Sequence, residues 1–314
     1  LVFSITGRYF LIYKSFKPIE NILYNLKNIN ASDLTKKIKK LESNDEVDLL
    51  ITEINNLLKR LESSFKKINQ FSSDASHELK TPLTIIRGEM EITLRKSRSE
   101  LEYKQSLEVC LDEVLRIQQT IDDLLFLAKS NFNMKKDFEE IYLDELVLES
   151  IKELKNYAKY KRITLVPKTV EALQIQGHST LLKVAIKNII KNAINFSYEN
   201  NNVIISNYEV KNKCIISIED KGIGIPKEQA SKVFEEFYRT DKSRNKESGG
   251  TGLGMAISKK IVEIHNGTLK LESKENQGTT VLINLKRFKN ECKIFSKNQF
   301  FSYYSPCTYN FLVK

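Results

Sequence analysis

The sequence contains little glycine, proline or cysteine and no tryptophan. Its 314 residues include only 11 glycines, 5 prolines and 4 cysteines. With 41% apolar and 29% charged residues, this composition fits poorly with collagen-like, disordered and multi-span membrane proteins. At about 150 residues per domain, the length predicts two domains. We therefore expect a mostly soluble, folded and helix-rich protein.

The four cysteines, Cys110, Cys214, Cys292 and Cys307, lie far apart and form no CxxC pair. This spacing argues against a zinc cluster and against a disulfide framework. Buried or incidental thiols in a reducing compartment are the simpler interpretation.

Lysine and arginine outnumber the acidic residues, which gives a net charge of +10. A basic surface attracts phosphate, so nucleic-acid binding has to be considered. The basic residues, however, occur in mixed-sign helices such as 59–67, and no arginine stripe is interleaved with aromatic residues. A basic surface near a membrane or against an acidic protein explains the excess equally well, and we expect no direct contact with nucleic acid.

Residues 1–13 form an apolar run that Arg8 interrupts. The run is shorter than the roughly 20 residues that a bilayer requires, and no cationic segment precedes it, as a signal peptide would need. Because the chain starts at Leu1, we expect it to begin inside a membrane helix, with Lys14 and Lys17 on the cytoplasmic side. A core strand is the alternative.

Two heptad patterns follow. Ile19, Ile22, Leu26 and Ile29 come after Pro18 at helical spacing. A longer series then advances by 4 and 3 without a break: Val47, Ile51, Ile54, Leu58, Leu61, Phe65 and Ile68. Such a series is typical of a coiled-coil seam, which transmits position or rotation.

The fold class predicted from the remaining pattern is α+β. Helices over 69–98 and 101–130, joined by a short polar turn, predict an antiparallel hairpin whose apolar stripe would be buried in a four-helix bundle of two copies. An α/β sandwich is expected to follow, because strand-like runs alternate with helical segments. The strands are expected at 162–166, 203–210, 214–219, 268–272 and 280–285, and the helices at 144–160, 178–195 and 252–264.

The first candidate site lies on the helix that begins the hairpin. Helical geometry turns His77 away from the apolar stripe and towards solvent. Glu78 can orient the proton on one ring nitrogen and so make the other more nucleophilic. Thr81 lies four residues later on the same face, where it can hold a water molecule, and Pro82 should bend the helix just beyond.

A second candidate site is the asparagine series Asn188, Asn192 and Asn195, at steps of 4 and 3 along one helical face. Asparagine oxygens are neutral, hard ligands that suit Mg²⁺. A solvated helix face is an equally good explanation of the series alone.

Two glycine-containing segments complete the candidate set. Asp220, at a strand end, can accept a hydrogen bond from an adenine amino group, while Gly222 and Gly224 allow close approach of the backbone. The run Gly250, Thr251, Gly252, Leu253 and Gly254 precedes a helix, where free N–H groups favour phosphate. It fits neither a Walker loop nor a dinucleotide fingerprint.

The segment SHELKTPL is followed in order by the asparagine series, the segments 220–224 and 234–239, and the glycine run 250–254. In this order and spacing, the sequence closely resembles a sensor histidine kinase of the two-component type. The resemblance covers about residues 14–286, and the two heptad helices with their connector resemble a HAMP linker. Residues 86–91 resemble a metal-responsive, copper-sensor-like branch. Asn195 departs from the family pattern, which usually has Lys or Arg there.

The resemblance implies roles for individual residues. His77 would be the phosphoacceptor and Glu78 the general base, with Thr81 helping to remove phosphate from the regulator. Asn192 would be the Mg²⁺ ligand and Asn188 would support the phosphates. Around the ATP, the resemblance places Asp220, Gly222, Gly224, Arg239, Gly250, Thr251, Gly252, Leu253, Gly254 and Thr279. Arg239 would reach the γ-phosphate, with a salt bridge inside the lid as the alternative. Phe234 and Phe237 would pack within this lid, which lies between Gly224 and Gly250.

The expected organisation is a truncated transmembrane helix (1–13), a HAMP linker (14–68), a dimerisation and phosphotransfer domain (69–134), an ATP-binding domain (135–286) and an atypical tail (287–314). The resemblance implies an inner-membrane homodimer that uses ATP and Mg²⁺, and a response regulator receiver domain as its partner. An ATPase of the chaperone or DNA-repair type and a non-catalytic scaffold are the alternatives. His178 and His265 are expected to be structural or exposed.

Overall fold

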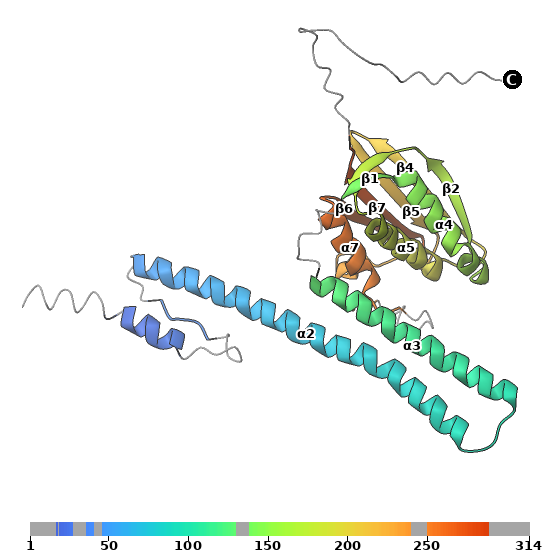
Figure 1. The fold of residues 1–314 in the computed structure, drawn as a ribbon. Helices are drawn as coiled ribbons and strands as arrows, with labels where there is room; N and C mark the ends of the chain where they lie inside the picture. The colour runs from blue at the N-terminus through green and yellow to red at the C-terminus, as the bar shows by residue number, and fades with distance from the viewer. Residues whose placement is uncertain are drawn as a thin grey trace, which may run out of the picture.

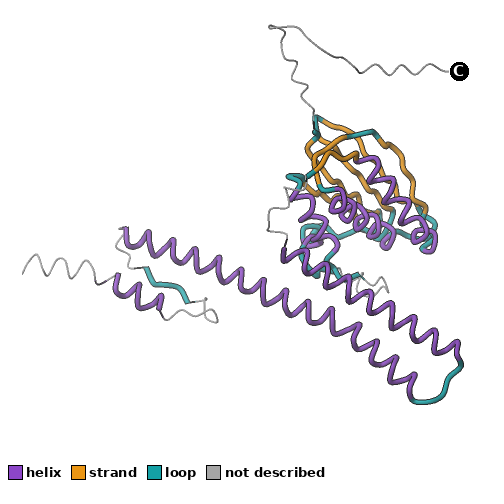
Figure 2. The backbone as a smooth tube through the Cα atoms, in the orientation of Figure 1, coloured by secondary structure: helices purple, strands orange, loops and turns teal. Residues whose placement is uncertain are grey.

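The computed structural model describes residues 17, 19–27, 36–40, 46–129, 138–239 and 250–288. The expected membrane segment, Cys292, Cys307 and nearly all of the tail lie outside the described residues. Within the described residues, a long helical hairpin leads into an α/β domain (Figures 1 and 2). None of the helices in this part of the chain combines the length and apolarity needed to cross a bilayer.

The hairpin consists of α2 (Glu46–Leu94) and α3 (Glu100–Lys129), which run antiparallel (Figure 1). The second heptad series and the first hairpin helix thus form one continuous helix of 49 residues. This helix ends at Leu94 rather than at residue 98, because Ser99 caps the next helix. The Ser99 N–H donates to the Glu102 carboxylate at 2.8 Å, and the Glu102 N–H donates to Ser99 Oγ at 3.3 Å, which is a capping box.

Two short segments pack beside the start of α2. Ile22, in a helical stretch over 19–27, forms a small buried cluster with Ile38 and Ile51. The Asn55 amide fixes the backbone of Ile38 by accepting from its N–H and donating to its carbonyl, both at 2.9 Å. The described residues of this region thus include two helical segments with a non-helical stretch between them. No finding tests whether they form a HAMP linker, which stays a prediction.

The α/β domain is built on a five-stranded sheet with the order β2-β4-β5-β7-β6, in which only the β2–β4 pair is parallel. Its helices lie on one face of the sheet (Figure 1). The strands of this sheet are β2 (Thr164–Val170), β4 (Asn202–Val210), β5 (Lys213–Asp220), β6 (Thr268–Lys274) and β7 (Gly278–Lys286). The helices are α4 (Leu143–Tyr160), α5 (Ser179–Phe196) and α7 (Gly254–Ile264), with a short 3-10 helix, η2, at Lys232–Phe234.

These elements confirm the predicted hairpin followed by an α/β sandwich. The domain also contains a small second sheet that was not predicted, in which β1 (Glu139–Tyr142) pairs antiparallel with β3 (Gln174–Gly177). Each of these strands has four residues, which is too short for an alternating pattern to stand out.

The hairpin packs on the α/β domain at two places. Leu124, Phe126 and Leu127 near the end of α3 contact the main hydrophobic core. Phe71 of α2 meets Phe237, with the ring centroids 5.7 Å apart. These contacts bring α3 against the edge of the domain that carries α5 and α7.

His265 is a buried structural residue at the end of α7. Its Nδ1 lies 2.7 Å from the Ile261 carbonyl oxygen, and its Nε2 accepts from the His178 N–H at 2.9 Å. The ring stacks on Phe138 at a centroid distance of 4.7 Å. One nitrogen must therefore donate while the other accepts, which only the neutral imidazole can do. His265 thus connects α7 to the start of α5.

We expect this neutral histidine to make stability depend on pH. Burial lowers the pKa of His265 below its ordinary value of 6.5, so the unfolded chain binds a proton first as pH falls. The contribution of His265 to the free energy of unfolding is therefore fully present above about pH 6.5 and decreases as the pH falls below that value. Urea unfolding of wild type and His265→Gln should show the variant less stable by about 1–3 kcal/mol at pH 7.5, with the gap narrowing towards pH 5. A gap that stays constant with pH would contradict this account.

Candidate functional site

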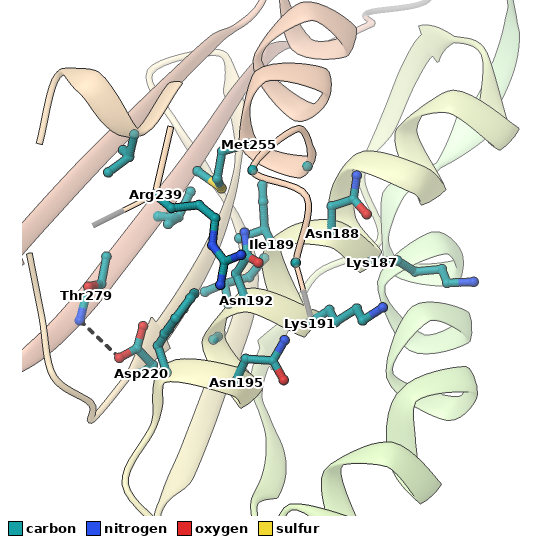
Figure 3. Close-up of a pocket in the computed structure, with 18 of the residues that line it drawn as sticks. Lys187, Asn188, Ile189, Lys191, Asn192, Asn195, Asp220, Arg239, Met255 and Thr279 are labelled. Carbon is teal, nitrogen blue, oxygen red and sulfur yellow. Dashed lines mark hydrogen bonds between the residues drawn. The ribbon is translucent and has the colours of Figure 1, made fainter. Parts of the chain in front are cut away.

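A cavity of about 660 Å³ lies between α5, the turn after β5, the glycine segment before α7 and the hairpin helix α3 (Figure 3). Most of the sequence-predicted residues of the α/β domain line it. They are Asn188, Asn192, Asp220, Gly224, Arg239, Gly250, Thr251, Gly252, Gly254 and Thr279. The structure therefore brings together residues from five separate segments of the chain.

The asparagine series is placed by the packing of α5. One face of this helix is fully buried in the core, including Leu182, Ile186 and Ile190. The helical period then turns Asn188 and Asn192 towards the cavity, where both are half-buried. A solvated helix face, the alternative for this series, does not describe them.

Asn195 also lines the cavity, but its side chain is already engaged. The Tyr157 hydroxyl of α4 donates to Asn195 Oδ1 at 2.6 Å. Asn195 therefore presents its amide, without a charge, at a place where the family pattern has a cation.

Asp220 ends the inward-facing series of β5. Cys214, Ile216 and Ile218 alternate into the core, and Asp220 takes the next inward position with 7% of its surface exposed. The Thr279 N–H donates to Asp220 Oδ1 at 3.3 Å. Burial raises the pKa of Asp220 to about 7, against the hydrogen bonds from the Thr279 and Gly222 backbone. A carboxyl group that changes protonation state near neutral pH inside a cavity is typical of a binding or catalytic site.

Gly222 holds the turn after β5 against the end of α5. A Cβ at this position would lie 1.9 Å from the Phe196 carbonyl oxygen, which accepts from the Ile223 N–H at 3.2 Å. Only glycine fits such an approach of two backbone segments. The contact fixes Asp220 relative to the asparagines of α5.

The glycine segment before α7 packs on the other side of the cavity. Gly252 has a φ of +76°, and a Cβ there would lie 2.8 Å from the Phe237 carbonyl carbon. Gly254 faces Asn188, and Leu253 is fully buried beneath the segment. Arg239, just after Phe237, reaches into the cavity (Figure 3). The close contact between Gly252 and the Phe237 backbone thus holds the segment that carries Arg239 against the glycine segment.

Thr279 is fixed by its neighbours on the other side of Asp220. Its Oγ1 lies 2.8 Å from Ser273 Oγ, which also accepts from the Ile225 N–H at 2.8 Å. These bonds tie Thr279 to the segment that follows Gly224.

The residues around His77 lie on α2, outside the cavity. His77 is exposed, as predicted, and Glu78 is half-buried beside it. Within the described hairpin, no hydrogen bond joins the Glu78 carboxylate to the His77 ring, and the Thr81 hydroxyl donates to the His77 carbonyl at 3.2 Å. The structure therefore shows an accessible imidazole that lies outside the cavity.

Several residues that line the cavity were missed from the sequence. Arg116, Gln119 and Asp123 of α3 form one wall, and Lys187 and Lys191 of α5 lie beside the asparagines. The spacing of Lys191, three residues after Asn188, could have revealed it. The α3 residues could not be predicted, because they line the cavity only through the packing of the hairpin on the α/β domain.

Two family models match the chain. The His Kinase A (phospho-acceptor) domain matches residues 67–132, and the histidine kinase-, DNA gyrase B-, and HSP90-like ATPase matches residues 177–289. The first match contains His77, and the second contains the asparagine series, Asp220 and the glycine segment. The two candidate sites thus fall in two separate matched domains.

Curated relatives agree with these matches. The chain is 35% identical over 271 residues to the signal transduction histidine-protein kinase ArlS of Staphylococcus haemolyticus, and 31% identical to that of Staphylococcus aureus. In both comparisons the match covers 85% of this chain and 59% of the relative. The chain therefore spans less than two thirds of the length of these relatives.

Solved structures share the fold. The histidine kinase ThkA in complex with the response regulator protein TrrA matches 78% of this chain and 68% of that chain, with a TM-score of 0.59 at 22% identity. The Acinetobacter baumannii histidine kinase AdeS matches 67% of this chain and 97% of that chain, with a TM-score of 0.54 at 21% identity. These likenesses extend across the hairpin and the α/β domain.

The backbone contact at Gly222 predicts a strong effect of one methyl group. Gly222→Ala should lower the free energy of unfolding by about 1–3 kcal/mol, because its Cβ would overlap the Phe196 carbonyl. Gly250→Ala is the matched control, since a Cβ at Gly250 meets no atom within 4 Å, and it should change stability by less than about 0.5 kcal/mol. Chemical denaturation measures both values. Equal stability of the two variants would show that the approach at Gly222 is not restrictive.

Proposed function

Because this chain belongs to the sensor histidine kinases of two-component systems, we propose that it transfers the γ-phosphoryl group of ATP to His77 and then to an aspartate of a response regulator. The single observation that carries this proposal is the cavity. It is lined by a desolvated carboxyl group and by a row of asparagines, in the same chain as an exposed histidine.

The adenine end of the cavity would be formed by Asp220. Its carboxylate, ordered by the Thr279 N–H, can accept from the adenine amino group. Gly222 and Gly224 leave the backbone free of side chains there, so the base can approach closely. Thr279 would line the same end.

The phosphate end would be formed by α5 and the segment before α7. Asn188 and backbone N–H groups of residues 250–254 can hold the phosphate oxygens. Asn192 would bind Mg²⁺, whose charge offsets that of the phosphates. Among the described residues, no group of three His, Cys, Asp or Glu could hold a metal, so a magnesium ion would depend on Asn192, water and phosphate. Arg239 would reach the γ-phosphate, where negative charge moves during transfer.

His77 would attack the γ-phosphorus with one ring nitrogen, while the bond to the oxygen bridging the β- and γ-phosphates breaks and ADP leaves. Glu78 would accept or orient the proton on the other nitrogen, and Thr81 would position water when phosphate is removed from the regulator. Since His77 lies outside the cavity, transfer requires the α/β domain to move along the hairpin or to serve a second copy.

The partners follow from exposed surfaces of the hairpin. Leu107, Leu111 and Leu115 of α3 are exposed in the single chain, which favours burial against a second copy in a four-helix bundle. The solved complex of ThkA with TrrA supports a response regulator as the partner. An inner-membrane location, through residues 1–13 and a HAMP linker over 14–68, belongs to the same proposal. So does a copper-sensor-like branch for residues 86–91.

The transfer to His77 is tested with γ-labelled ATP and Mg²⁺ on the purified chain. We expect wild type to acquire an acid-labile, alkali-stable label, and His77→Gln to acquire none. His178→Gln, at a histidine outside the hairpin, is the control and should keep the label. Free phosphate released equally by wild type and His77→Gln, without label, would instead support an ATPase of the chaperone or DNA-repair type. No turnover would support a scaffold.

Nucleotide binding should depend on pH through Asp220. Its pKa of about 7 leaves the carboxyl group mostly protonated at pH 6 and mostly ionised at pH 8, and the ionised form accepts more strongly from adenine. Affinity for Mg·ATP should therefore rise by up to about tenfold between pH 6 and 8. Calorimetric titrations of Asp220→Asn should show weaker binding with a flatter pH profile. An unchanged profile in this variant would remove Asp220 from the adenine site.

A further inference from the structure

The hairpin supplies one wall of the cavity, and that wall carries a carboxylate. Arg116, Gln119 and Asp123 of α3 line the cavity together with Lys191 and Asn195 of α5. These five residues line the same cavity as Asn188 and Asn192, which would hold the phosphates of a nucleotide and the magnesium ion. An acidic side chain in such a position is unexpected, because it repels phosphate.

Asp123 is held in place and partly removed from water. The Gln119 amide donates to Asp123 Oδ1 at 2.8 Å. Burial raises the pKa of Asp123, the Gln119 hydrogen bond lowers it and the charge of Asp122 raises it, while the positive charge of Lys191 lowers it least. Asp123 and Lys191 carry opposite charges and line the same cavity, the carboxylate on α3 and the ammonium on α5. The neighbouring Asp122, by contrast, is exposed and lies outside the cavity lining.

Lys191 is the lysine of α5 that is available to a ligand. Lys183 and Lys187 both form ion pairs with Glu153 of α4, at 2.7 and 2.5 Å. Lys191 forms no ion pair with any residue that the structure describes. Its Nζ instead lies 5.8 Å from the centre of the Tyr157 ring, a contact that a cation makes with an aromatic face.

Lys191 places a positive charge on the same side of α5 as Asn195, where the family pattern has a cation. Lys191 comes three residues after Asn188 and four before Asn195, so the three share one side of α5. Figure 3 shows Lys191 beside Asn195 at the same end of the cavity. Asn195 itself is engaged by the Tyr157 hydroxyl.

We propose that Lys191 is a phosphate-binding cation of the nucleotide cavity and that Asp123 of the hairpin competes with the nucleotide phosphates for it. The inference rests on the proposed function, since it requires ATP to occupy this cavity. Packing of α3 against the cavity and binding of the triphosphate then oppose one another. By linkage, ATP favours release of the hairpin wall to the same extent that the wall weakens ATP binding.

The test is a double-mutant cycle on the full chain, read by equilibrium binding of Mg·ATP and of adenosine at one ionic strength. Asp123→Asn should tighten Mg·ATP binding by about three- to fivefold, the size expected for one partly exposed charge interaction. It should leave adenosine binding unchanged, because adenosine lacks phosphates. Asp122→Asn removes the same charge from the adjacent exposed residue and should change neither affinity.

Lys191→Gln should weaken Mg·ATP binding several-fold, and in that background the gain from Asp123→Asn should be clearly smaller, leaving only the direct repulsion between carboxylate and phosphate. An equal gain from Asp122→Asn would reduce the effect to net charge and overturn the inference. The same gain from Asp123→Asn with and without Lys191 would mean simple repulsion of phosphate, which also overturns it. Thermal unfolding of each variant checks that the fold is retained. Failure of wild type to bind Mg·ATP would overturn the proposed function itself, and the inference with it.

Discussion

The packing of α5 into the core is the constraint on which the site depends. Leu182, Ile186 and Ile190 have none of their surface exposed. Full burial of one such side chain contributes about 1.5–3 kcal/mol, so rotating the helix by one residue would cost more than any single contact at the site could return. With this face fixed, the helical period determines where the asparagines and Lys191 must lie.

The same packing also determines the chemistry at Asp220. The turn after β5 rests on the end of α5 through Gly222, so the position of Asp220 follows from that of the helix. The inward alternation of β5 then buries the carboxyl group, and burial raises its pKa to about 7. The geometry around Asp220 and its sensitivity to pH therefore have one physical origin. His77 is free of this constraint, because it stands exposed on a helix outside the domain core.

Much of this arrangement could be predicted from the sequence. Periodicity located the hairpin helices and the five long strands, and residue spacing located the asparagines, Asp220 and the glycine segment. The strands β1 and β3 were missed because four residues carry too little pattern. The end of α2 was predicted four residues too late, because Ser99 caps the next helix. The hydrogen bonds that keep His265 neutral include one from the backbone of His178, which is far away in sequence. Asp123 could not be recognised, since only the packing of α3 on the domain makes it part of a cavity.

Helix α3 belongs to the hairpin and also lines the cavity. We therefore expect ligand binding in the cavity to change how tightly the hairpin packs on the α/β domain. The most direct test of this account is a crystal structure of the full chain with Mg²⁺ and a non-hydrolysable ATP analogue. The account predicts the adenine amino group on the Asp220 carboxylate, Mg²⁺ on the Asn192 side-chain oxygen and the phosphates within reach of Lys191. An analogue bound outside this cavity, or bound within it without contact to Asp220 and Asn192, would contradict it.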